Sequence, residues 1–312
     1  MHDLTHHTTM LRSARAVGVL FCSKQTVETF RAHLFSAECL FEVARAAGFL
    51  GAKATPQLLP GCHAATLDSM ELSFEFLDGE QHAAHFPEEV LQRTGIVILG
   101  EAKSIGRAGV EMQVLTAVTV AALEMLDKLR PRDAQLEIGS IRLLEANTKK
   151  GKSVATSPTC AVLVCSDAKA SGKRNDNSGQ LIRRMLEEAG ASVPHFAVVP
   201  AATAQIQEQL RAWVAADVPF IFTTGGTGLG TQGDAVTAVE ELLEKRAEGI
   251  VEAMRCHGQQ RTPLAMLSRG VAGTIGNTLV VTLPGSTSGA REALEALLPA
   301  VFHARRMMRR SS

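Results

Sequence analysis

Residues 219–230 read PFIFTTGGTGLG, and this stretch decides the fold of the C-terminal half. Its apolar start is β-prone and free of charge, which predicts a buried strand over Val218–Phe222. Three glycines and three threonines fill Thr223–Gly228, and such a backbone can turn sharply and point several N–H groups into one concavity. A helical pattern resumes at about Ala235. A strand, a glycine loop and a helix N-terminus suit an anion, usually a phosphate; the alternative is a tight turn that only needs positive φ.

Strand and helix patterns alternate on both sides of this loop. The β-prone runs are Ala161–Ser166, Phe196–Pro200, Val218–Phe222 and Thr278–Leu283, and helical patterns follow from about Gly179, Thr203, Ala235 and Ala290. Four strand–loop–helix units in succession predict a parallel sheet with helices on both faces. In such an α/β domain the binding site lies at the C-terminal ends of the strands.

The loops at those strand ends hold the candidate polar residues. Ser166-Asp167 follows the first strand, and Asn175–Gly179, NDNSG, is a cluster of helix N-cap residues. Asp234 lies just past the glycine loop, and Leu283–Ser286, LPGS, follows the last strand. For each aspartate a helix cap or a turn is the alternative to a binding role.

The N-terminal half mixes strands and helices in a different rhythm. Strands are predicted over Ala14–Cys22, Met70–Phe76, Ile96–Ala102 and Ile138–Leu144, and helices over Gln25–Gly48 and Gly109–Leu129. No strand–helix–strand alternation runs through them, so an α+β layer is expected.

Length and composition exclude several classes of protein. The 312 residues favour two domains, and 46% hydrophobic against 21% charged residues is enough for a sizeable core. Thirty-two basic residues balance thirty-two acidic ones, which argues against a nucleic-acid surface. The six cysteines form no CxxC pair and no zinc-type spacing, and the N-terminus lacks a signal-peptide pattern. With no apolar run of about 18 residues, a cytoplasmic protein without a membrane span is expected.

Several residues of the N-terminal half could carry chemistry. Cys62 and His63 follow a Pro-Gly turn, and for the histidine the alternative is a plain turn residue. Glu111 opens the long helical pattern, where it would also favour the helix dipole. Asp127 and Arg130 lie three residues apart on one helix face, and the alternative there is a surface ion pair.

The strings LLPGCH, GVEMQVLTAVTVAAL and IGSIRLLE resemble the MoaC family, the cyclic pyranopterin monophosphate synthases of molybdenum-cofactor biosynthesis. The resemblance covers about Ser13 to Lys152. It implies hexamers and a cleft between subunits, where a guanine-derived nucleotide is rearranged and cyclised with release of pyrophosphate. The family roles fall on the substrate contacts Cys62, Met112, Gln113 and Arg130 and on the catalytic candidates His63, Glu111 and Asp127, the last as acid–base residue.

Three positions depart from that family's pattern. The family has a lysine where this chain has Ala37, a second lysine where it has Arg130, and a glutamate where it has Gln113. Arginine keeps a phosphate-binding charge but cannot readily release a proton, whereas a buried lysine can. Two hypotheses follow for this half: an active cyclase, or a binding or scaffolding relic.

The motifs SD…NDNSG, TTGGTG, AMLSRGVAGTIG and LPGS resemble the MogA/MoaB family of molybdopterin-binding domains, from about Cys160 to the C-terminus. The resemblance implies trimers, and transfer of AMP from Mg-ATP to the terminal phosphate of molybdopterin. Mg²⁺ and ATP are then expected as cofactors, with none tightly bound. Substrate contacts are expected at Asp167, Asp176, Ser178, Thr224, Gly225, Gly226, Thr227, Gly228 and Ser286. Asp234 is the catalytic candidate and the expected Mg²⁺ ligand.

This half also departs from its family. The usual PRDVTPEA after the glycine loop is TQGDAVTA here, so Asp234 matches only with a one-residue shift. Ala201 stands where the family has an aspartate, and Ser288 stands where it has a lysine. Each charged group in a phosphoryl-transfer site typically contributes about 3 kcal/mol to transition-state stabilisation. Pterin binding is therefore better supported than adenylyl transfer.

The sequence as a whole predicts a fusion of the two families. The expected boundaries are 1–148 for an α+β MoaC-like domain, 149–159 for a linker, and 160–312 for an α/β MogA/MoaB-like domain. The expected partners are pterin or nucleotide substrates and further copies of the chain. The alternative is a non-catalytic pterin-binding or scaffolding protein of the same pathway.

Overall fold

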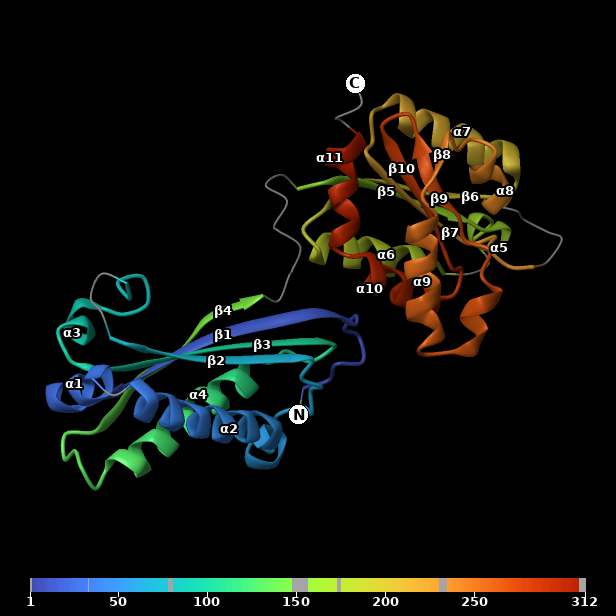
Figure 1. Cartoon of the computed structure of the whole chain (residues 1–312). Coiled ribbons are helices and arrows are strands. Elements are labelled where there is room, and N and C mark those ends of the chain that lie inside the picture. Colours follow the sequence, from blue (N-terminus) through green and yellow to red (C-terminus); the bar gives the residue numbers. More distant parts are fainter. Residues whose placement is uncertain are drawn as a thin grey trace. The chain divides into compact units, whose positions relative to one another are not determined.

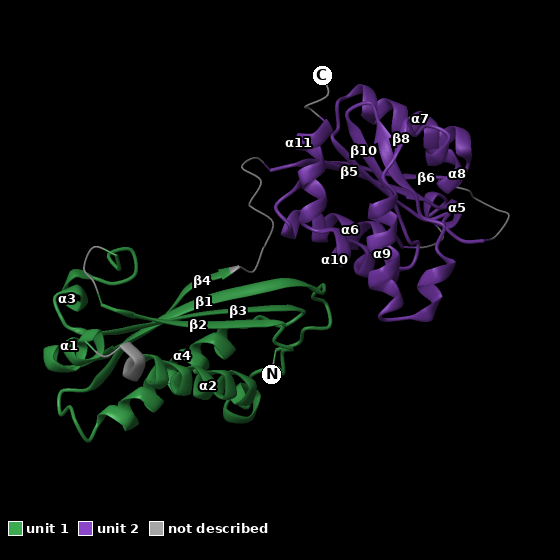
Figure 2. Cartoon of the chain, viewed as in Figure 1, with its two compact units in different colours: residues 1–149 green, residues 150–312 purple. Residues whose placement is uncertain are grey.

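The chain folds into two compact units, residues 1–149 and 150–312 (Figures 1 and 2). The computed structural model describes residues 2–32, 34–77, 81–147, 157–172, 175–229 and 235–308, and for residues 34–37 and 147 it describes the backbone only. In those ranges, no helix combines the length and the apolar character needed to cross a membrane.

The first unit is built on a four-stranded antiparallel sheet. Its strands are β1 (Met10–Phe21), β2 (Ser69–Phe76), β3 (Gly95–Gly106) and β4 (Glu137–Asn147), in the order β2-β3-β1-β4. Alternate residues of β1 and β3 face opposite sides of the sheet, so Leu20 and Ile98 are buried in the main core while Val19 and Val97 belong to a smaller cluster.

Two long helices cover one face of this sheet (Figure 1). They are α2 (Leu34–Leu58) and α4 (Glu111–Leu129); the short helices are α1 (Lys24–Ala32) and α3 (Glu88–Leu91). The side of α4 that carries Val114, Val118 and Met125 is fully buried against the sheet. The α+β prediction is confirmed, and the helical segment predicted over Gln25–Gly48 corresponds to α1 and the first part of α2, which lie on either side of residue 33, outside the described residues.

The second unit contains a mixed six-stranded sheet in the order β6-β5-β7-β10-β9-β8. Four adjacent strands are parallel: β6 (Ser192–Val199) at one edge, then β5 (Thr159–Cys165), β7 (Phe220–Thr224) and β10 (Thr278–Leu283). The linker predicted over 149–159 lies mostly outside the described residues, and its last residue, Thr159, begins β5.

The predicted parallel sheet is confirmed, and one edge of it adds two antiparallel strands. Strands β9 (Ala272–Ile275) and β8 (Lys245–Arg246) run antiparallel to their neighbours. Ile275 pairs with Thr278 across a two-residue turn, Gly276-Asn277, in which Gly276 has φ +55°. A Gly-Asn pair between two apolar runs is a hairpin signal, so the sequence did contain the information.

Helices cover both faces of the sheet, as predicted. One face carries α6 (Asn177–Glu188), α9 (Glu248–Gln259) and α10 (Thr287–Leu297); the other carries α7 (Thr203–Ala215) and α8 (Ala235–Glu240). Shorter elements complete the unit: α5 (Asp167–Ala170), the 3₁₀ turns η1 (Pro263–Leu267) and η2 (Ala300–His303), and α11 (Ala304–Met308). The C-terminal ends of β5, β7 and β10 therefore meet at one edge, where the candidate loops begin.

Candidate functional site

The glycine loop turns sharply at the end of β7. Gly225 and Gly226 have φ values of +96° and +62°, which side-chain-bearing residues rarely adopt. A Cβ added at Gly225 would lie 2.2 Å from the carbonyl oxygen of Cys165. The turn therefore needs glycine for both conformation and space, and it lies directly against the end of β5.

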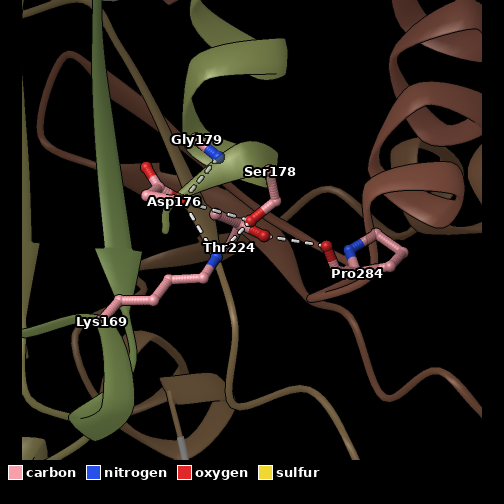
Figure 3. A network of polar contacts seen from close by, with 6 residues as sticks. All are labelled: Lys169, Asp176, Ser178, Gly179, Thr224 and Pro284. Atoms are coloured by element: carbon pink, nitrogen blue, oxygen red, sulfur yellow. Dashed lines mark hydrogen bonds and ion pairs between the residues drawn. The ribbon is translucent and has the colours of Figure 1, made fainter. Parts of the chain in front are cut away.

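The loop after β10 holds the glycine loop from the other side. Thr224 Oγ1 donates a hydrogen bond to the Pro284 carbonyl oxygen at 2.8 Å (Figure 3). A Cβ at Gly285 would lie 3.3 Å from the Cα of Gly225, so the two loops are in contact. Ser286 caps α10, because its Oγ accepts a hydrogen bond from the Gly289 N–H at 3.2 Å.

The N-terminus of α6 carries a nearly buried charged cluster. Asp176 caps this helix by accepting the Gly179 N–H at 2.9 Å, as its N-cap interpretation predicts. Lys169 Nζ lies 2.9 Å from Asp176 Oδ1 and 2.6 Å from Ser178 Oγ, and Figure 3 shows its ammonium group between the two. The exposed fractions of the lysine and aspartate side chains are 16% and 12%, so water screens this ion pair only weakly.

This cluster adjoins the glycine loop. A Cβ at Gly179 would lie 2.5 Å from Val164 Cγ2, and Val164 is the register partner of Thr224 in the sheet. The start of α6, the end of β5 and the glycine loop are therefore neighbours. Sequence reasoning missed Lys169, whose only signal was a lysine in the polar segment between a strand and an N-cap.

Two carboxylates of the site differ in their partners. Asp167 is exposed, and its Oδ1 accepts the Ala201 N–H at 2.9 Å, which joins the ends of β5 and β6. Asp176 Oδ2 is buried and has no hydrogen-bond donor within the described part of the chain. A buried carboxylate oxygen without a donor is costly, so a ligand or cation that reaches it would be favoured.

Asp234, the expected Mg²⁺ ligand, lies outside the described residues. Elsewhere in the described ranges, no group of three or more histidine, cysteine, aspartate or glutamate side chains could hold a metal ion. Arg269 belongs to the motif AMLSRGVAGTIG, which by itself does not predict a role for it. Its side-chain Nε donates a hydrogen bond to the Gly228 carbonyl oxygen at 3.2 Å. Its backbone N–H donates one to the Thr227 carbonyl oxygen at 3.4 Å. A guanidinium group therefore borders the glycine loop.

A pocket of about 450 Å³ opens beside Ser286, between α9, η1 and α10. Its walls are mainly aliphatic and include Val251, Met254 and Leu264, while Glu292 is one of its few charged groups. The sequence analysis predicts no helix over α9 and therefore no pocket beside it.

The candidate residues of the first unit form a separate cluster at the start of α4. Gln113 Nε2 donates to the His63 carbonyl oxygen at 3.4 Å and lies 3.6 Å from Cys62 Sγ. Gln113 is 1% exposed, and its Oε1 has no partner among the described residues. Glu111 and Met112 occupy the same helical turn, and Met112 is 42% exposed. The turn LLPGCH is therefore attached to the first turn of α4.

The remaining candidates of this unit lie elsewhere. Asp127 and Arg130 are exposed at the far end of α4, and the described chain contains no ion pair between them within 4.0 Å. Asp127 lies fourteen positions after Gln113, which corresponds to about 21 Å along a helix. The two ends of α4 therefore hold separate groups of candidate residues. Ala37 belongs to α2, and its side chain lies outside the described part.

Comparison with known proteins gives two matches in tandem. Residues 1–151 match the model of the MoaC family, and residues 161–303 match that of the probable molybdopterin binding domain. The chain is 36% identical to the molybdenum cofactor biosynthesis bifunctional protein of Chlorobaculum tepidum, covering 99% of this chain and 94% of that one. It is 29% identical to the protein of the same description from Synechococcus elongatus, covering 97% and 95%.

Solved structures match the second unit. The molybdopterin biosynthesis enzyme MoaB of Thermus thermophilus is 40% identical, with a TM-score of 0.46, covering 48% of this chain and 95% of that chain. The molybdopterin biosynthesis Mog protein of Mycobacterium ulcerans is 33% identical, with a TM-score of 0.46, covering 49% and 99%.

Proposed function

Because the chain belongs to the family of bifunctional molybdenum cofactor biosynthesis proteins, in which a MoaC domain precedes a MogA/MoaB domain, we propose that its second unit binds the terminal phosphate of a pterin at the glycine loop. Both component families are enzymes, the cyclic pyranopterin monophosphate synthases and the molybdopterin adenylyltransferases. The protein therefore serves molybdenum cofactor biosynthesis.

The observation that carries this proposal is the conformation of Gly225 and Gly226. Two successive residues with positive φ, packed on the Cys165 carbonyl, support a concave run of backbone N–H groups from Gly225 to Gly228. Lys169 and Arg269 add positive charge on two sides of this loop. Thr224, Thr227, Asp167, Asp176, Ser178 and Ser286 would complete the contacts with the substrate.

Adenylyl transfer is the proposed reaction. A terminal phosphate oxygen of the pterin would bond to the α-phosphorus of ATP, and the bond between the α-phosphorus and the bridging oxygen would break to release pyrophosphate. Asp234 is the proposed Mg²⁺ ligand, because Mg²⁺ prefers carboxylate oxygens, and waters and ATP phosphates would complete its shell. The chain's own part is to position the two phosphates and neutralise their charge.

The first unit would bind a guanine-derived nucleotide between two copies of the chain. One copy would supply Cys62, His63, Glu111, Met112 and Gln113 from the start of α4, and the other would supply Asp127 and Arg130 from its end. The roughly 21 Å between the two ends supports this division. It also supports assembly of the chain into an oligomer, a trimer or a hexamer.

One observation favours a binding role over full cyclase chemistry in this unit. A glutamine stands at position 113 where the family has a glutamate, and its buried amide donates toward Cys62 and His63. A neutral amide cannot take up a proton as a carboxylate can. If the unit is a relic, the triple change Ala37→Lys, Gln113→Glu and Arg130→Lys should raise cyclase turnover; an unchanged rate would contradict the relic hypothesis.

The central experiment incubates the purified full chain with molybdopterin and Mg-ATP. Adenylylated molybdopterin, identified by mass spectrometry, would establish the transferase. Measurable pterin binding without product would leave the non-catalytic alternative. Absence of binding in titration calorimetry would overturn the proposed phosphate site.

A further inference from the structure

We propose that Glu292 recognises the edge of a 2-amino-4-oxopyrimidine ring, and that the pterin of the substrate lies in the pocket between α9, η1 and α10. This inference rests on the proposed pterin binding of the second unit and adds the residue that would read the ring. The ligand edge in question presents two adjacent N–H donors, the 2-amino group and N3–H.

The pocket has the size and lining of a site for a flat ring. Its volume of about 450 Å³ falls within the usual range of small-molecule sites, roughly 300–1,000 Å³. Met254 and Ala293 are buried residues of the core that also line it, and Leu264 is an exposed lining residue. Aliphatic walls and a thioether suit the faces of a heteroaromatic ring. The ring would therefore be held by its faces, which leaves its edge to polar groups.

Glu292 is the polar group best placed for that edge. It lies on α10, is half-buried, and lines the pocket. Its Oε2 is 3.9 Å from the position of a Cβ added at Gly258, another lining residue, so the carboxylate is directed between α9 and α10. No hydrogen bond or ion pair satisfies it in the part of the chain that the structure describes. A partly desolvated carboxylate of this kind gains most from a ligand with two donors.

The hydrogen-bond donors on the ring edge distinguish the pterin from the adenine of ATP. A carboxylate accepts two parallel N–H bonds from a 2-amino-4-oxopyrimidine, much as it does from an arginine fork. Adenine presents an amino group beside a ring nitrogen lone pair, which a carboxylate repels. The pocket therefore fits the pterin and excludes the adenine of ATP. Ser286 lines the pocket and follows Gly285, which contacts the glycine loop, so the phosphate tail of a ring bound here would extend toward that loop.

The test uses two probes that differ only at the proposed edge. They are 6-hydroxymethylpterin monophosphate and its lumazine counterpart, in which a carbonyl replaces the 2-amino group, and both are titrated calorimetrically into the full chain. Wild type should bind the pterin roughly 10- to 100-fold more tightly, because charged hydrogen bonds are worth about 1.5–3 kcal/mol. Glu292→Gln should lose most of this preference, mainly through weaker pterin binding.

Glu295→Gln provides the matched control. Glu295 lies on the same helix, outside the pocket, and pairs with His257 at 3.5 Å, so its variant should keep the wild-type preference. An equal affinity of wild type for pterin and lumazine would overturn the inference without any variant. GMP carries the same edge, and tighter binding of GMP than of the pterin phosphate would overturn the assignment to pterin. Failure of both pterin and lumazine phosphates to bind would instead refute the proposed function itself.

Discussion

Position 225 of the glycine loop accepts no side chain without strain. Alanine at this position would combine a strained backbone with a contact of 2.2 Å to the Cys165 carbonyl oxygen. We expect Gly225→Ala to lower the free energy of unfolding of the second unit by roughly 2–4 kcal/mol and to weaken phosphate binding. Trp213, the single tryptophan, is buried in this unit, so its fluorescence in urea reports the change.

Gly249 supplies the comparison for that experiment. It lies in the first turn of α9, and nothing is within 4 Å of a Cβ added there. Gly249→Ala should be neutral or slightly stabilising. Equal losses in the two variants would show that the close approach to Cys165 does not determine the stability of the loop.

Lys169 joins the α5 segment to the cap of α6. Lys169→Met would leave Asp176 and Ser178 without their cationic donor, and we expect a loss of about 2 kcal/mol in the free energy of unfolding and weaker phosphate binding. The exposed pair Arg183–Glu187 on α6 is the control, because Arg183→Met should cost less than about 0.5 kcal/mol. If both variants lose the same stability in urea, Lys169 is only a surface contact.

The sequence predicted the parts of the site that depend on local backbone conformation better than the positions of its long side chains. The glycine turn and the Asp176 cap follow from local rules about positive φ and N-cap side chains, and both are present. Lys169, Arg269 and Glu292 were missed because the position of a long side chain depends on the tertiary neighbours of its Cα. A local pattern contains no information about those neighbours.

At the scale of elements, periodicity located the main strands and long helices but not the sheet edge. The parallel core follows from strand–helix alternation, whereas β8 is two residues long and offers no period to detect. The pairing of so short a strand depends on tertiary packing.

The start of α1 is tied to the segment after α4 by one carboxylate, and this contact predicts a pH dependence. Asp133 accepts hydrogen bonds from the Thr26 hydroxyl at 2.7 Å and from the Ser23 N–H at 2.8 Å. Burial opposes ionisation, but the bonds from Thr26, Ser23 and Gln135 outweigh it and lower the pKa of Asp133 to about 2. Its stabilisation is thus present above the unfolded pKa of about 3.8 and lost as the pH falls toward about 2.

The measurement compares wild type with Asp133→Asn by urea unfolding between pH 6 and pH 2, followed by far-UV circular dichroism. The difference in stability between the two proteins should be constant above about pH 5 and shrink toward pH 2. A difference that stays constant over the whole range would mean that Asp133 does not titrate with folding.

At the scale of the whole molecule, each unit has its own hydrophobic cores. The clusters around β1 and α4 draw only on the first unit, and those around β5 and β7 only on the second. Ile98 is fully buried in the core of the first unit, so Ile98→Ala should lower the free energy of unfolding of that unit by about 2–5 kcal/mol. The circular-dichroism transition should move to lower urea while the Trp213 fluorescence transition stays in place. Transitions that shift together would show that the two units unfold as one.

The length of α4 has a genetic consequence. With Gln113 and Asp127 about 21 Å apart on a straight helix, damage at one end leaves the other intact. If the chain forms the proposed oligomer, co-expressed His63→Ala and Asp127→Asn chains should give mixed assemblies in which one interface contains only undamaged contacts. Nucleotide binding should then reappear although neither chain binds alone. Such allelic complementation, scored by titrating the mixture, would be absent if each copy worked by itself.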